Sequence, residues 1–102
     1  MTDKIPPQNV EAEESILGSC LLDPNAISRI ADILTPEAFY FSVHQQIYKA
    51  VLELYNHSLP TDLLAVTSWL SDKKLLTKVG GKTQLSKLVE ATVSAVNIDH
   101  VA

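Results

Sequence analysis

Apolar residues recur every three or four positions along most of the chain, and this spacing is typical of one buried face of an α-helix. Alternation of apolar and polar residues, the pattern of a half-buried β-strand, is almost absent. Prolines and capping residues divide the pattern into short segments, joined by linkers that redirect the chain sharply. The sequence therefore predicts an all-α fold, a compact orthogonal bundle of about six short helices.

The first predicted helix begins after the two prolines at positions 6 and 7, with Asn9 as its N-cap. Its apolar stripe consists of Val10, Ile16, Leu17, Cys20 and Leu21. Gly18 lies within this helix and is expected to be tolerated there, at a cost of about 1 kcal/mol relative to alanine. Three acidic side chains suit the positive end of the helix dipole, and we expect them to be solvated: Glu11, Glu13 and Glu14.

Three further helix starts follow in the middle of the chain. Asp23 is predicted to cap the next helix, with Pro24 at its first position. The apolar positions of that helix are Ile27, Ile30, Ala31 and Leu34. The sequence TPE at 35–37 predicts the start of a short helical turn. The sequence SVHQ at 42–45 has the form of a capping box, which predicts a helix with the stripe Ile47, Val51, Leu54 and Tyr55.

The last part of the chain combines helical segments with a lysine-bearing loop that ends in the glycine pair at 80–81. Asp62 is predicted to cap the helix before the loop. The buried positions expected for that helix are Leu63, Val66, Trp69 and Leu70. Thr83 is predicted to cap a helix after the loop, containing Leu85, Leu88 and Val89. Ser94 is predicted to cap one more helix, which begins at Ala95.

Length and composition change this picture little. A chain of 102 residues with 46% hydrophobic residues is the size of one ordinary domain with its own core. The single cysteine, Cys20, cannot form an intramolecular disulfide and suits a reducing cytosol. The first residues lack the pattern of a signal peptide, and no apolar run approaches the ~20 residues of a membrane-spanning helix. We therefore expect a cytoplasmic protein without a membrane partner.

The distribution of charge singles out one segment. The formal net charge of −4 argues against a protein that coats nucleic acid, because phosphate binding depends on Lys and Arg. All lysines of the C-terminal part nevertheless lie close together in sequence: Lys73, Lys74, Lys78, Lys82 and Lys87. They are candidates for a solvated loop, a protein-contact patch or a nucleic-acid contact. The first is favoured, since the segment lacks an arginine and has no aromatic residue to stack a base.

Motifs for catalysis or ligand binding are weak. The sequence GGKT at 80–83 resembles the end of a phosphate-binding loop, but Leu76 stands where that motif needs its first glycine. A glycine hinge before a capped helix is the favoured interpretation. The histidines do not share metal-ligand spacing with Cys20 or with carboxylates, and are interpreted as structural: His44, His57 and His100. We expect no catalytic, cofactor or metal site, and interpret the chain as a helical interaction module.

Several short strings are informative through their order and spacing. They are PPQNVEAE at 6–13, ILGS at 16–19, LLDP at 21–24, FY at 39–40, VHQQIY at 43–48, PTDL at 60–63, VGG at 79–81 and SAVNI at 94–98. Together they cover nearly the whole chain, and in this order it resembles the N-terminal domain of the bacterial replicative DNA helicase, the DnaB family.

The resemblance implies an all-helical module followed by a helical hairpin that pairs subunits, so that six copies form a collar. A linker helix then leads to a RecA-like motor, which uses ATP and magnesium to unwind duplex DNA at the replication fork. Primase docks on the collar, and DNA is contacted through the whole helicase. The implied compartment is the bacterial cytoplasm, or the stroma of an organelle. This chain alone is expected to bind no cofactor and to have no enzymatic activity.

On this resemblance we divide the chain into an N-terminal extension, residues 1–8, a globular module, residues 9–93, and the incomplete start of the dimerising hairpin, residues 94–102. We expect such a chain to be monomeric or weakly associating. The alternative is a free-standing helical adaptor or regulatory module. A motif GxxxxGK[ST] further along the reading frame, within a strand-loop-helix context, distinguishes the helicase from the adaptor.

Overall fold

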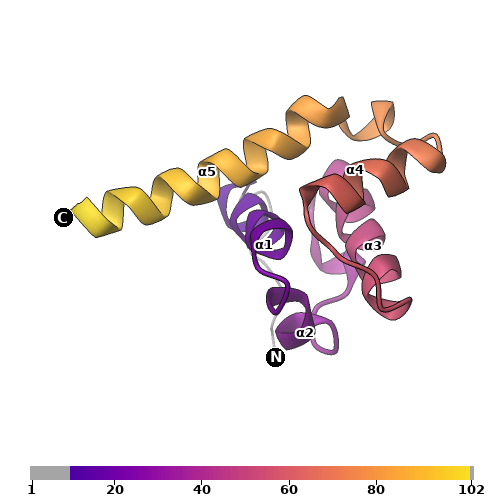
Figure 1. Cartoon of the computed structure of the whole chain (residues 1–102), viewed down its shortest axis with the longest axis horizontal. Coiled ribbons are helices and arrows are strands. Elements are labelled where there is room, and N and C mark those ends of the chain that lie inside the picture. The colour runs from indigo at the N-terminus through magenta and orange to yellow at the C-terminus, as the bar shows by residue number, and fades with distance from the viewer. Residues whose placement is uncertain (1–9, 102) are drawn as a thin grey trace.

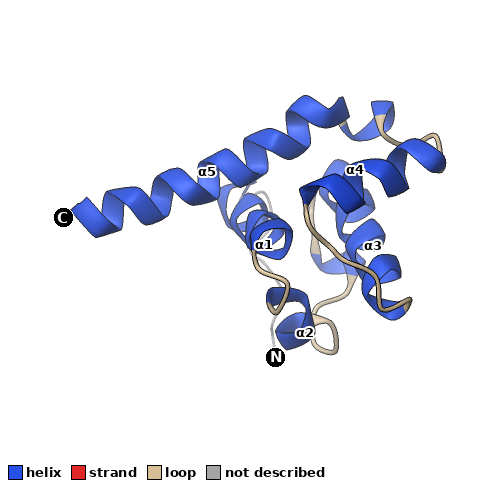
Figure 2. Ribbon diagram, viewed as in Figure 1, coloured by secondary structure: helices blue, strands red, loops and turns tan. Residues whose placement is uncertain are grey.

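The computed structural model describes residues 10–101, with side chains described for residues 10–93. Its elements in chain order are α1 (Val10–Leu22), α2 (Ala26–Ile30), η1 (Pro36–Ala38), α3 (Ser42–Asn56), α4 (Leu63–Asp72), η2 (Thr77–Val79) and α5 (Gly81–Val101). The η elements are single 3₁₀ turns. Within the described range every regular element is a helix or a 3₁₀ turn (Figure 2), which confirms the all-α prediction.

Helix α5 is the longest element and differs most from the prediction. It crosses the molecule above α1, and its C-terminal end extends beyond the other helices (Figure 1). The predicted helix break at Ser94 is wrong, and so is the predicted cap at Thr83, because one helix runs from Gly81 to Val101. Neither glycine nor proline occurs at 82–101, so nothing in the backbone interrupts the helix once it has begun.

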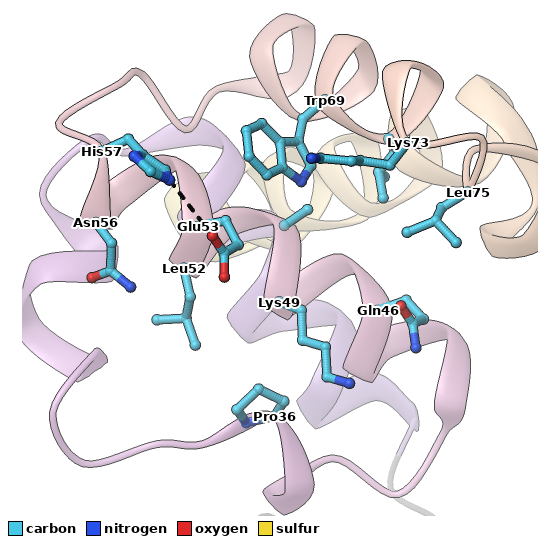
Figure 3. Close-up of a pocket in the computed structure, with 12 residues that line it drawn as sticks. Pro36, Gln46, Lys49, Leu52, Glu53, Asn56, His57, Trp69, Lys73 and Leu75 are labelled. Carbon is cyan, nitrogen blue, oxygen red and sulfur yellow. Dashed lines mark ion pairs between the residues drawn. The ribbon is translucent and has the colours of Figure 1, made fainter.

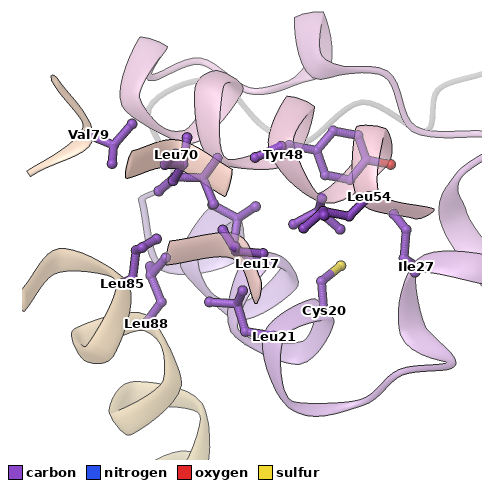
Figure 4. Packing of buried hydrophobic residues seen from close by; sticks show 14 of the residues in the cluster. Leu17, Cys20, Leu21, Ile27, Tyr48, Leu54, Leu70, Val79, Leu85 and Leu88 are labelled. Carbon is purple, nitrogen blue, oxygen red and sulfur yellow. The ribbon is translucent and has the colours of Figure 1, made fainter. Parts of the chain in front are cut away.

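The hydrophobic core lies where α1, α3, α4 and α5 meet (Figure 4). Each of these helices contributes fully buried side chains, for example Leu17, Tyr48, Leu70 and Leu85 in that order. Tyr48 was not part of the predicted stripe. Its hydroxyl donates a hydrogen bond to the carbonyl oxygen of Leu34 at 2.7 Å, which satisfies its polar atom inside the core.

Most predicted stripe positions are buried or partly buried, but Val10 and Tyr55 are exposed. Val10 is the first residue of α1, and Tyr55 is the penultimate residue of α3. Cys20 is buried as predicted, and burial raises the pKa of its thiol to about 11. This cysteine therefore acts as a small apolar side chain of the core.

Gly18 has a more specific role than the sequence indicated. A Cβ atom built at this position would collide with the side chain of Thr92 and would lie 2.6 Å from the carbonyl oxygen of Leu88, both on α5. The missing side chain thus allows α1 and α5 to pack at short distance. Sequence reasoning treated this glycine as tolerated, whereas the structure requires it.

Of the helix caps predicted for α2, α3 and α4, only the last is present in the structure. The cap at Asp62 is confirmed, since its carboxylate accepts the N–H of Ala65 at 2.9 Å. The predicted capping box at 42–45 is wrong: Phe41 occupies the N-cap position, and the Gln45 amide donates to the carbonyl of Phe39 instead.

The predicted cap at Asp23 is also wrong, because α2 has Asn25 at its N-cap. The Asp23 carboxylate accepts the N–H of Asn25 and pairs with Arg29, and these bonds lower the pKa of Asp23.

The loop between α4 and α5 is organised as predicted around its glycine pair. Gly80 ends η2 with a φ of 101°, in the left-handed region that favours glycine, and Gly81 follows with a φ of 78°. Gly81 is also the first residue of α5. The pair therefore forms the turn that leads into α5, at the place where the sequence predicts the loop to end.

Candidate functional site

The candidate partner-contact lysines occupy four different settings between α4 and α5. Lys73 follows the last residue of α4, and Lys74 has a left-handed backbone with a φ of 61°. Lys78 lies in η2, while Lys82 and Lys87 lie on α5. All five side chains are exposed. Each is therefore available for contact with solvent or with a partner.

The five lysines do not all line one groove. Lys73 lines a groove between α3 and α4, whereas Lys78 lines a separate groove beside Phe41 and Gln84. Lys82 and Lys87 are five residues apart, which places them about 140° apart around the helix axis. A partner contact through all five lysines stays a prediction, and it would have to extend over several faces of the module.

The groove between α3 and α4 is the larger of these two grooves, with a volume of about 630 Å³. Helix α3 provides one side, and α4 with the residues after it provides the other (Figure 3). The apolar part of its lining consists of Pro36, Ala50, Leu52, Trp69, Leu70 and Leu75. The polar part consists of Gln46, Lys49, Glu53, Asn56, His57 and Lys73.

Trp69 forms part of the α4 wall, although the sequence predicts it to be buried. It is half-buried, because Val66 and Leu70 point into the core and Trp69 lies about 100° around the helix from Leu70. The ammonium of Lys73 lies 4.7 Å from the ring centroid of Trp69. Such a cation–π contact contributes about 0.5–1 kcal/mol at an exposed site. The His57 ring lies on the other side of the groove, 6.2 Å from the Trp69 ring.

The α3 wall carries two charged side chains, Lys49 and Glu53, that the sequence analysis did not single out. A row of side chains at intervals of four consists of Lys49 and Glu53 on α3 and of His57, which directly follows the helix. Side chains at this spacing lie on the same side of a helix. His57 Nε2 lies 3.7 Å from Glu53 Oε1, and both side chains are more than half exposed. The spacing was the available signal for this row. Only the packing of α3 against α4, however, places this row in the same groove as Trp69 and Lys73.

A second polar cluster is buried between α1 and α3. The side chains of Glu13 and His44 are 0% and 3% exposed, and Glu13 Oε1 lies 2.7 Å from His44 Nδ1. The same carboxylate accepts the N–H of Tyr40 at 2.6 Å and the N–H of Phe41 at 3.4 Å. The prediction that Glu13 is solvated is therefore wrong. Its polar partners offset the cost of burial, and the carboxylate fastens α1 to the start of α3.

Neither polar cluster has the composition of a metal site. In the part of the chain that the structure describes, no three His, Cys, Asp or Glu side chains gather closely enough to hold a metal ion. His44 is buried in contact with Glu13, while the side chain of His100 lies outside the described residues. Among the described helices, none combines the length and apolarity needed to span a membrane.

Comparisons with known proteins agree over nearly the whole chain. A family model for the DnaB-like helicase N terminal domain matches residues 5–102. The replicative DNA helicase DnaB of Nostoc sp. is 57% identical over 101 residues, which cover 99% of this chain and 12% of that protein. The replicative DNA helicase DnaC of Bacillus subtilis is 40% identical over 102 residues, which cover 100% of this chain and 22% of that protein.

A solved structure supports the same relationship. The crystal structure of the N-terminal domain of DnaB helicase from Mycobacterium tuberculosis superposes with a TM-score of 0.79 and 38% sequence identity. The superposition covers 85% of this chain and 60% of that one. The chain thus shares both sequence and fold with these relatives, while it spans only a small part of the length of the complete helicases.

Proposed function

Because the chain belongs to the family of DnaB-like helicase N-terminal domains, we propose that it serves as the assembly and primase-docking domain of a replicative DNA helicase. The observation that carries this proposal is the match to helicases over 99% of the chain at 57% identity. The all-helical fold and its superposition on a DnaB N-terminal domain support it. The role is to hold other molecules in position, without chemistry of its own.

The shape of the module supports an assembly role. Helix α5 continues to Val101, and its C-terminal end extends away from the other helices (Figure 1). A helix gains most of its stability from packing one face against other elements. The projecting end is therefore suited to pack against a neighbouring subunit, in line with the proposal that residues 94–102 begin a dimerising hairpin.

The activity of the whole helicase belongs to other parts of the polypeptide in this proposal. ATP and magnesium bind in the motor domain, which unwinds duplex DNA at the replication fork. DNA is contacted through the assembled helicase, and the compartment is the bacterial cytoplasm or an organellar stroma. The exposed lysines between Lys73 and Lys87 form part of the surface available to primase.

Binding to primase is the direct test. Isothermal titration of this chain with the C-terminal region of its cognate primase is expected to give saturable binding. Lysine-to-glutamate changes at single positions then map the contact: Lys73, Lys74, Lys78, Lys82 and Lys87. Absence of binding both to this chain and to a longer form that contains the hairpin would overturn the docking role.

A further inference from the structure

The groove between α3 and α4 has an anchor point for an apolar side chain. Trp69 is only half-buried, and it borders the groove together with Leu52 and Leu75 (Figure 3). Exposed tryptophans in pockets often dominate the energy of protein interfaces, because they offer a large rigid surface at low entropic cost. A leucine-sized side chain placed against Trp69 would remove apolar area of both partners from water.

The charge of the groove is opposite to that of the chain. The chain carries a formal charge of −4, yet the groove is lined by two lysines against one glutamate. That glutamate, Glu53, already has His57 as a neighbour at 3.7 Å. Lys49 on α3 and Lys73 after α4 thus remain to receive an acidic partner. A polyanion such as nucleic acid is a poorer fit, since its dense charge is also repelled by the acidic chain as a whole.

From this lining we infer that the groove binds a short amphipathic segment of a partner protein, with an apolar side chain against Trp69 and acidic side chains facing Lys49 and Lys73. Helical peptides commonly bind in this way, with apolar anchors in a groove and charged residues at its rim. The cation–π contact places Lys73 directly beside the anchor surface. The inference concerns this chain alone and does not depend on the proposed role in a helicase.

Trp69 makes the inference directly measurable, because it is the only tryptophan in the chain. The probe is a synthetic tryptophan-free helical peptide of about 14 residues, four turns, with leucine on one face and glutamate beside it. The matched probe carries lysine in place of each glutamate. We expect the acidic peptide to give a saturable blue shift of Trp69 emission that weakens as salt is raised, and the basic peptide to give none.

Two double variants locate the binding. K49E/K73E reverses the charge of the groove, whereas K82E/K87E changes the net charge equally on α5, outside the groove lining. We expect K49E/K73E to weaken binding of the acidic peptide at least about tenfold, or about 1.4 kcal/mol, and K82E/K87E less than about twofold. Circular dichroism checks that both variants fold, and K49Q/K73Q replaces the first if it does not.

Three results would overturn the inference. The first is an emission spectrum unchanged by the acidic peptide, and the second is an equal response to both peptides. The third is an equal loss of affinity in the two double variants, which would mean that only the net charge of the chain attracts the peptide.

Discussion

Replacing Gly18 with alanine tests the close packing of α1 against α5. In an isolated helix this change is stabilising by about 1 kcal/mol, because alanine has the higher helix propensity. In this fold the new methyl group would collide with the Thr92 side chain and lie 2.6 Å from the Leu88 carbonyl oxygen. The two effects have opposite signs, so the sign of the measured change decides which of them dominates.

The steric effect is expected to prevail. Adding atoms to a packed interior costs about 1–3 kcal/mol, and the upper end applies here because one of the colliding atoms belongs to the backbone. We therefore expect G18A to lose about 2 kcal/mol of unfolding free energy, and its melting temperature to fall by about 10 °C for a domain of this size. Urea denaturation followed by circular dichroism measures the first quantity, and a thermal scan measures the second.

Two further variants separate the causes. S15A, at an exposed position of α1, is expected to change stability by less than about 0.5 kcal/mol. T92A removes one of the two colliding groups, so G18A should cost about 1 kcal/mol less in that background. A G18A protein as stable as the parent would refute the reasoning, because the glycine would then be merely tolerated and the helices would not need it.

Three other predictions concern burial and assembly. E13A should lose about 3 kcal/mol of unfolding free energy in urea, because it removes the buried carboxylate that contacts His44 and two backbone N–H groups. E11A, at an exposed position, should change the unfolding free energy by less than about 0.5 kcal/mol. Equal effects of the two changes would contradict the buried contact. Cys20, with its pKa raised to about 11, should react with a thiol reagent at pH 8 much more slowly in the native chain than in denaturant, and comparable rates would show that it is accessible. Sedimentation velocity of the chain should show a monomer or a weakly associating species, and a tight hexamer would show that residues 1–102 suffice for assembly.

The sequence alone determined the class of the fold, the cap at Asp62 and the place of the glycine turn before the last helix. Periodicity, the cap at Asp62 and the glycine pair at 80–81 each act within one or two helical turns, so they can be recognised without knowledge of the rest of the chain. The family resemblance has the same origin, since it depends on the order of short local strings. The absence of helix breakers at 82–101 was also visible, but the prediction gave too much weight to a capping residue at Ser94.

The tertiary structure decided which faces meet. Gly18 is required because α5 passes over it, and Glu13 is buried because the start of α3 supplies its hydrogen-bond partners. Lys49 and Lys73 lie far apart in sequence and line one groove, whereas Lys73 and Lys78 lie close in sequence and line different ones. Helical periodicity specifies that a face is apolar or charged. It contains no information about which other face will cover it, because that choice depends on the packing of all the helices together.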